Sequence, residues 1–168
     1  MLLAALGDVT HRGWHCRCVG PLDGEPRFVT GLYRQAQLGG LDGRVEFTGP
    51  RTGADLEAVF ASADVLVHPA RVEGYGMVVT EALAHGLPVI TTTSGGLPDA
   101  LGATADGVRP GLLVPVGDAL ALAHAISTWL ADQDLRGRLR VAAQTRRRGL
   151  PTWSSTTERI EHVLRALA

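Results

Sequence analysis

Residues Asp64–Gly96, DVLVHPARVEGYGMVVTEALAHGLPVITTTSGG, contain the pattern that decides the fold of this chain. The predicted elements are a strand over 64–68, a glycine-containing loop, a helix over 75–85, a strand over 88–92 and a Gly-Gly turn. A strand, a helix and a strand in this order form a βαβ unit with parallel strands. Two carboxylates need an explanation, because Glu73 lies in the loop and Glu81 about two turns further on.

Strands and helices also alternate on both sides of this unit. The other predicted strands cover 15–20, 44–48 and 111–114, and the other predicted helices cover 1–13, 27–38, 53–62, 97–101, 118–130, 135–148 and 152–168. Thr52 with Asp55 resembles a capping box, and Asp118 can cap a helix. Alternating apolar strands and helices predict one Rossmann-like α/β domain, in which a parallel sheet carries helices on both faces.

Composition narrows the class of protein. The 168 residues carry a net charge of −1, so they lack the basic field that nucleic-acid binding needs, and we expect no nucleic-acid partner. Cys16 and Cys18 are the only cysteines and are expected to be reduced and structural, because two such close thiols are too few for a metal site. The chain has neither an apolar run of about 20 residues nor a signal-peptide pattern, so a cytoplasmic location is expected.

Glycine-rich turns follow the predicted strands, at the sheet edge where parallel α/β proteins bind ligands. The helix after Gly74 and Gly76 offers unpaired N–H groups, which favour a phosphate. Carboxylates only accept hydrogen bonds, and one carboxylate can bind both hydroxyls of a vicinal diol. This chemistry indicates a sugar at each end of a phosphate, although Glu73 and Glu81 could also be ordinary surface residues of a helix.

Three segments resemble one known family: RVEFTG from Arg44, ADVLVHPARVEGYGMVVTEALAHGLPVITTTSGG from Ala63, and GLLVPVGDALALAHAI from Gly111. They resemble the retaining glycosyltransferases of family 4, which have the GT-B fold, and the resemblance covers roughly Arg44 to Leu130. It implies a transferase of hexoses whose C-terminal, nucleotide-sugar-binding domain corresponds to this chain. A nucleoside-diphosphate sugar would be the donor substrate, with no cofactor and no metal ion.

The resemblance also implies roles for individual residues. Glu81 matches the glutamate that holds the ribose hydroxyls, and Glu73 matches the one that contacts the transferred sugar and is the catalytic candidate. The other donor-binding candidates are the loop residues Gly74, Tyr75 and Gly76, the helix start at Met77 and Val78, Gly49 and Arg51 near the base, and the turn Gly95 and Gly96.

Two parts of the family pattern are missing. An N-terminal, acceptor-binding domain would not fit in 168 residues, and any peripheral membrane contact would be made through it. The first strand of the donor domain, with its Arg and Lys-Gly pair, is also missing, and the chain contains no lysine. Arg51 or Arg71 could compensate in part. We therefore expect a fragment or a truncated reading frame with little transferase activity by itself.

Other interpretations remain open at this point. The chain could be a non-catalytic nucleotide-sugar-binding or partner module that acts only when docked on another chain. A dinucleotide-dependent oxidoreductase would need a G-x-G-x-x-G turn after its first strand, which is absent. Among the six histidines, expected to be structural or exposed, His68 lies nearest to the site. Arg146–Arg148 either complement a helix dipole or attract an anionic surface.

Overall fold

The structure is a computed structural model that describes residues 1–11, 13–150 and 153–166. Its strands are β1 (Cys16–Val19), β2 (Val45–Gly49), β3 (Leu66–His68), β4 (Val89–Thr92) and β5 (Gly111–Val114). Its helices are α1 (Leu2–Asp8), α2 (Pro26–Leu38), α3 (Gly53–Ser62), α4 (Met77–Ala84), α5 (Leu97–Leu101), α6 (Ala119–Ala131), α7 (Gln133–Arg148) and α8 (Trp153–Ala166). The predicted alternation of strands and helices is therefore confirmed.

All strand pairs are parallel, but they form two sheets instead of one. β1 pairs with β2, and β4 lies between β3 and β5. In the described part of the chain, β1 and β3 each have a hydrogen-bonded neighbour on one side only. Both sheets still contribute to the same hydrophobic core, which Cys16 of β1 and Val67 of β3 border together. The two sheets thus belong to one layer whose hydrogen bonding is interrupted between β1 and β3.

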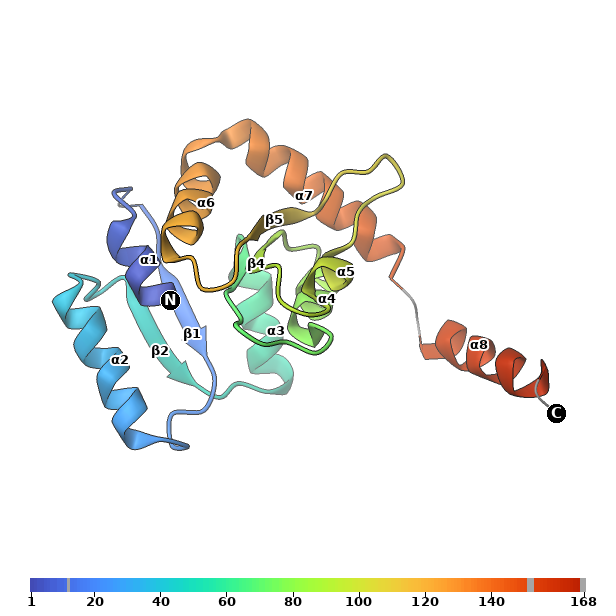
Figure 1. Cartoon of the computed structure of the whole chain (residues 1–168), viewed down its shortest axis with the longest axis horizontal. Coiled ribbons are helices and arrows are strands. Elements are labelled where there is room, and N and C mark those ends of the chain that lie inside the picture. The colour runs from blue at the N-terminus through green and yellow to red at the C-terminus, as the bar shows by residue number, and fades with distance from the viewer. Residues whose placement is uncertain (12, 151–152, 167–168) are drawn as a thin grey trace.

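Helices cover both faces of this layer (Figure 1). Every residue of β4 is buried, and neighbouring side chains alternate between the faces. Ile90 packs into a core with α1 and α6, whereas Val89 packs into a second core with α4, α5 and α7. A continuous apolar strand buried on both faces is what the sequence predicts for a parallel sheet. The Rossmann-like α/β fold is confirmed.

The observed helix caps agree only in part with those predicted from the sequence. Asp118 caps α6 as predicted, because its carboxylate accepts from the Ala121 N–H at 2.9 Å. The capping box at Thr52 is wrong: the Thr52 side chain makes no cap hydrogen bond, although α3 begins at the predicted residue. Asp132 caps α7 by accepting from the Leu135 N–H at 2.8 Å, a cap that the sequence prediction missed. It extends that helix two residues toward its N-terminus.

α8 extends beyond α7, away from both sheets (Figure 1). Its apolar residues Ile160, Val163 and Leu164 are each more than half exposed. The Trp153 side chain and Leu167 lie outside the described part. Within the described ranges, no helix is both long and apolar enough to cross a membrane.

Candidate functional site

The loop after β3 is fixed by direct contact with the Gly-Gly turn after β4. Gly95 adopts a φ of +50°, and a Cβ added to it would lie 1.8 Å from the carbonyl oxygen of Glu73. A Cβ on Gly96 would lie 2.6 Å from the carbonyl oxygen of Gly74, and the Gly96 N–H donates to that same oxygen at 3.2 Å. Two backbones can approach this closely only where side chains are absent, which explains why both positions are glycine.

Hydroxyl groups that follow along β4 bind the same loop from beneath. Thr91 donates to the carbonyl of His68 at 2.8 Å, and Thr92 donates to the carbonyl of Ala70 at 2.7 Å. Ser94 completes the series by donating to the carbonyl of Arg71 at 3.1 Å. All three hydroxyl-bearing residues are buried. Each bond pairs a backbone carbonyl with a buried hydroxyl, so together they hold the loop in place at the end of the sheet.

Glu73 is held at both carboxylate oxygens. Its Oε1 accepts from the N–H groups of Gly74 at 3.0 Å and Gly76 at 3.3 Å, and its Oε2 lies 3.2 Å from Nε2 of His68. The hydrogen bond from His68, followed by those from the backbone, holds the pKa of Glu73 below the ordinary glutamate value. The side chain is still 27% exposed, so an ionised carboxylate with a fixed orientation faces solvent.

Helix α4 begins directly after this loop, with Gly76 in the left-handed region at a φ of +92°. A Cβ on Gly76 would lie 2.9 Å from Leu97, so α5 packs against the start of α4. Among the described residues, the N–H groups of Met77 and Val78 meet no protein acceptor. They point outward at the positive end of the helix dipole, which is suited to an anion.

Glu81 lies one helical turn after Met77, on the same exposed face of α4. Val79 and Leu83, on the opposite face, are fully buried. No described protein group donates a hydrogen bond to the Glu81 side chain, in contrast to Glu73. The first turns of α4 therefore carry three kinds of polar group: the fixed carboxylate of Glu73 before the helix, the unpaired N–H groups of Met77 and Val78, and the unpaired carboxylate of Glu81.

Two arginines near the sheet edge lie in different surroundings. Arg71 borders a hollow of about 660 Å³, the Arg71 hollow, between the carboxyl ends of β1 and β3; Met1, Gly20, Pro21, Phe28 and Pro69 also line it. Arg51 borders a second hollow, the Arg51 hollow, with Arg17, Glu46, Thr48, Asp55 and Ser62 beside α3. Of the two, Arg71 is the cation adjacent to Glu73 along the chain.

The structure brings most of the predicted residues together. Glu73, Gly74, Tyr75, Gly76, Met77, Val78, Glu81, Gly95 and Gly96 surround the start of α4. Gly49 lies elsewhere along the edge, at the end of β2, where its carbonyl accepts from the Gly20 N–H at 3.1 Å. The sequence prediction missed the supporting role of Thr91, Thr92 and Ser94. The signal was present, since a run of hydroxyl residues at the end of a buried strand needs partners.

Metal ligands do not gather in the described part of the chain. No three His, Cys, Asp or Glu side chains there form a group that could hold a metal ion. Cys16 and Cys18 are free thiols on the same face of β1. The hydrogen bond with Cys18, followed by burial, raises the pKa of Cys16, so this thiol stays protonated.

Comparison with known proteins identifies the family. The family described as "Glycosyl transferases group 1" matches residues 1–132. The chain belongs to this family. Group 1 relatives include a D-inositol 3-phosphate glycosyltransferase of Corynebacterium diphtheriae, 36% identical over 74% of this chain and 28% of the relative. Another, from Salinispora tropica, is 34% identical over 84% of this chain and 28% of the relative. The chain therefore spans less than a third of the length of these two relatives.

Solved structures of other proteins agree with the fold. HepE of Anabaena, in complex with UDP and glucose, is 27% identical, has a TM-score of 0.84 and matches 98% of this chain and 44% of its own. Sucrose-phosphate synthase of Thermosynechococcus elongatus is 29% identical, with a TM-score of 0.79 over 99% of this chain and 41% of its own. The whole chain therefore corresponds to under half of each of these glycosyltransferase-like structures.

Proposed function

We propose that this chain is the donor-binding, C-terminal domain of a retaining, family 4 glycosyltransferase that transfers a hexose from a nucleoside-diphosphate sugar. The observation that carries the proposal is the start of α4, where the unpaired N–H groups of Met77 and Val78 follow the fixed carboxylate of Glu73 and Glu81 is exposed one turn later. A nucleotide sugar has the matching order of groups, with a diphosphate between two hydroxyl-bearing sugars. The UDP and glucose bound by HepE support this ligand class.

Each group of the ligand has a candidate partner. The N–H groups of Met77 and Val78 bind the diphosphate, because they are unpaired and lie at the positive helix end. The free carboxylate of Glu81 accepts from the ribose diol, and charge-assisted bonds of this kind contribute about 1.5–3 kcal/mol each. Glu73 accepts from hydroxyls of the transferred hexose. We assign the catalytic role to Glu73, because its orientation is fixed before the sugar arrives.

The remaining predicted residues complete the site. Tyr75 is 59% exposed and Met77 is 78% exposed, so both side chains can cover the bound sugar. Gly95 and Gly96 act by supporting the loop. We assign the base to the turn after β2, at Gly49 and Arg51, which lies further along the same sheet edge. Arg71 supplies positive charge beside the diphosphate.

A complete transferase needs parts from outside these 168 residues. We propose a parallel strand between β1 and β3, and an N-terminal domain that binds the acceptor. The one-sided pairing of β1 and β3 supports the strand, and so does the Arg71 hollow between their carboxyl ends. The longer relatives support the second domain. Without these parts, the isolated chain has little transferase activity. A non-catalytic partner module is the less favoured alternative, because family membership points to an enzyme.

Calorimetric titration tests the proposed donor. UDP-glucose, GDP-mannose and ADP-glucose are added separately to the wild type and to Glu81→Gln. We expect saturable binding of one of them, with UDP-glucose tested first, and at least tenfold weaker binding by Glu81→Gln. Glu158→Gln, an exposed glutamate of α8, is the matched control and keeps wild-type affinity. No saturable binding of any donor, or equal affinities for wild type and Glu81→Gln, contradicts the proposal.

A further inference from the structure

His68 ends β3 at the floor of the proposed donor site, and both its backbone and its ring are held. Its carbonyl oxygen accepts from the buried hydroxyl of Thr91 at 2.8 Å. Its ring nitrogen Nε2 lies 3.2 Å from Oε2 of Glu73, and the side chain is 26% exposed. The ring therefore has one defined polar contact and stands on a fixed backbone.

We infer that His68 is a positioning residue that fixes the orientation of the Glu73 carboxylate toward the transferred sugar. The inference rests on the proposed function, because it assigns the sugar to Glu73. It adds a residue that acts through Glu73 without touching the reacting atoms itself.

The geometry shows why one more contact matters. The N–H groups of Gly74 and Gly76 both donate to Oε1, so they fix one oxygen of Glu73. The terminal torsion of a glutamate is broad and weakly restricted. Fixing Oε1 alone therefore leaves the carboxylate plane free to rotate. The contact from His68 to Oε2 fixes the second oxygen and with it the plane, which directs the remaining lone pairs of Glu73 to solvent.

The contact also defines the tautomer of His68. A carboxylate accepts and cannot donate, so the hydrogen of the pair must be on Nε2 of the ring. A glutamine at position 68 could place an amide N–H near the same point, whereas a leucine of similar size could not. This difference separates a positioning role from a role in packing.

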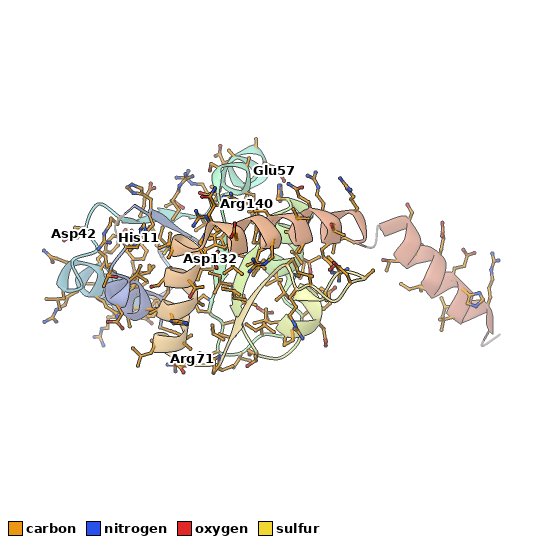
Figure 2. The ribbon with its side chains drawn as sticks, turned by 90° about the horizontal axis from the view of Figure 1, so that it is seen from above. His11, Asp42, Glu57, Arg71, Asp132 and Arg140 are labelled. Carbon is orange, nitrogen blue, oxygen red and sulfur yellow. The ribbon has the colours of Figure 1, made fainter. Side chains whose placement is uncertain are left out.

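The chain contains a second histidine–glutamate pair that serves as a matched control. Nε2 of His85 lies 3.4 Å from Oε2 of Glu57, and the His85 ring stacks on Phe60 at a centroid distance of 4.7 Å. Figure 2 shows Glu57 on the opposite side of the molecule from Arg71, which lies in the Glu73 loop. Changing His85 therefore removes a similar contact outside the proposed site.

The first test measures UDP and UDP-glucose binding by calorimetry for wild type, His68→Leu, His68→Gln and His85→Leu. We expect His68→Leu to bind UDP-glucose about tenfold more weakly and to bind UDP as the wild type does, since only the sugar reaches Glu73. His68→Gln should regain most of the lost affinity, and His85→Leu should lose none. An equal loss for UDP and UDP-glucose, or no loss for His68→Leu, overturns the inference. If neither ligand binds the wild type, the proposed function fails instead.

The second test needs no ligand and keeps the inference falsifiable in that case. Carbon-13 titration of the Glu73 carboxyl carbon by NMR reports its pKa in each variant. The hydrogen bond from His68 is the largest cause that lowers this pKa, so we expect His68→Leu to raise it toward the ordinary glutamate value. His85→Leu should leave it at the wild-type value. An unchanged Glu73 pKa in a folded His68→Leu protein overturns the positioning role.

Discussion

The carboxyl edges of the two sheets are built in different ways. At the edge of β3, β4 and β5, side chains stabilise two of the following segments: Thr92 and Ser94 hold the loop after β3, and Asp118 caps the helix after β5. At the edge of β1 and β2, a backbone bond between Gly20 and Gly49 joins the two turns, and Thr52 leaves α3 without a side-chain cap.

This difference teaches where binding is preorganised. Loops that are fixed before a ligand arrives lose little conformational entropy when it binds. The three-stranded sheet therefore holds in place the groups that we propose to bind the sugar and the diphosphate. The two-stranded sheet presents an open edge beside the Arg71 hollow.

We call the carboxyl edge of the three-stranded sheet the fixed edge. Replacing Gly95 with alanine should destabilise this edge more than any other substitution considered. The new Cβ would lie 1.8 Å from the carbonyl of Glu73 and would also be strained at a φ of +50°. We expect a loss of about 3 kcal/mol in the free energy of unfolding, measured by urea denaturation. Gly40→Ala is the matched control, because Gly40 has a φ of +62° but nothing within 4 Å of the added Cβ. It should cost about 1 kcal/mol, and equal losses would refute the close backbone contact.

Replacing Thr92 with valine should weaken the support of the same edge. Valine fills the same volume but leaves the partly buried carbonyl of Ala70 without its donor from the buried Thr92, which costs about 1–2 kcal/mol. Thermal and urea unfolding measure the loss, and hydrogen exchange in the loop after β3 should become faster. Thr93→Val is the control, since Thr93 is exposed and should change stability by less than about 0.5 kcal/mol. A harmless Thr92→Val would show that the hydroxyl does not hold the loop.

Substitutions at the two helix N-caps allow a direct comparison of the two sheet edges. Asp118→Ala removes a cap bond after β5 and should cost about 1 kcal/mol of unfolding free energy. Thr52→Ala, after β2, should cost less than about 0.5 kcal/mol because its side chain makes no cap bond. Urea denaturation of both variants measures the difference. A larger effect at Thr52 than at Asp118 would reverse the assignment of the fixed edge.

The smallest expected effect is the pH dependence of Glu73. Its pKa in the folded protein lies below the ordinary value of about 4.5, so its ionised form stabilises the fold above that pH. This contribution is lost as the pH falls through the lowered pKa. Thermal unfolding between pH 7 and pH 3 should therefore show a steeper acid loss for wild type than for Glu73→Gln. Parallel curves would contradict the three contacts to its carboxylate.

Much of this fold could be predicted from the sequence, because periodicity determines which elements form. The alternation around Asp64–Gly96 correctly predicts parallel strands with helices on both faces. The interruption between β1 and β3 could not be predicted, since strand pairing depends on contacts between segments far apart in the chain. Thr52 shows a similar limit: a residue type suited to capping does not ensure the side-chain rotamer that caps.

The candidate site was also predictable in part: contacts between residues close in sequence could be predicted, and contacts between distant residues could not. The grouping of Glu73 with Gly74 and Gly76 follows from their closeness in sequence, and the structure adds the hydrogen bonds between them. The contacts from β4 to the loop join residues more than 20 positions apart, so local patterns cannot show them. His68 is an intermediate case. The sequence shows that it is close to Glu73 along the chain, but it does not show that the ring points toward the Glu73 carboxylate.

Amide chemical-shift mapping with UDP-glucose tests the central claim most directly. The carboxyl edge of the three-stranded sheet is proposed to bind the sugar and the diphosphate of the ligand. We predict that the largest shifts occur at Gly74, Gly76, Met77 and Val78, with smaller shifts at Gly49 and Arg51, to which the base is assigned. Saturable shifts confined to the Arg51 hollow, with none at the start of α4, would contradict the account.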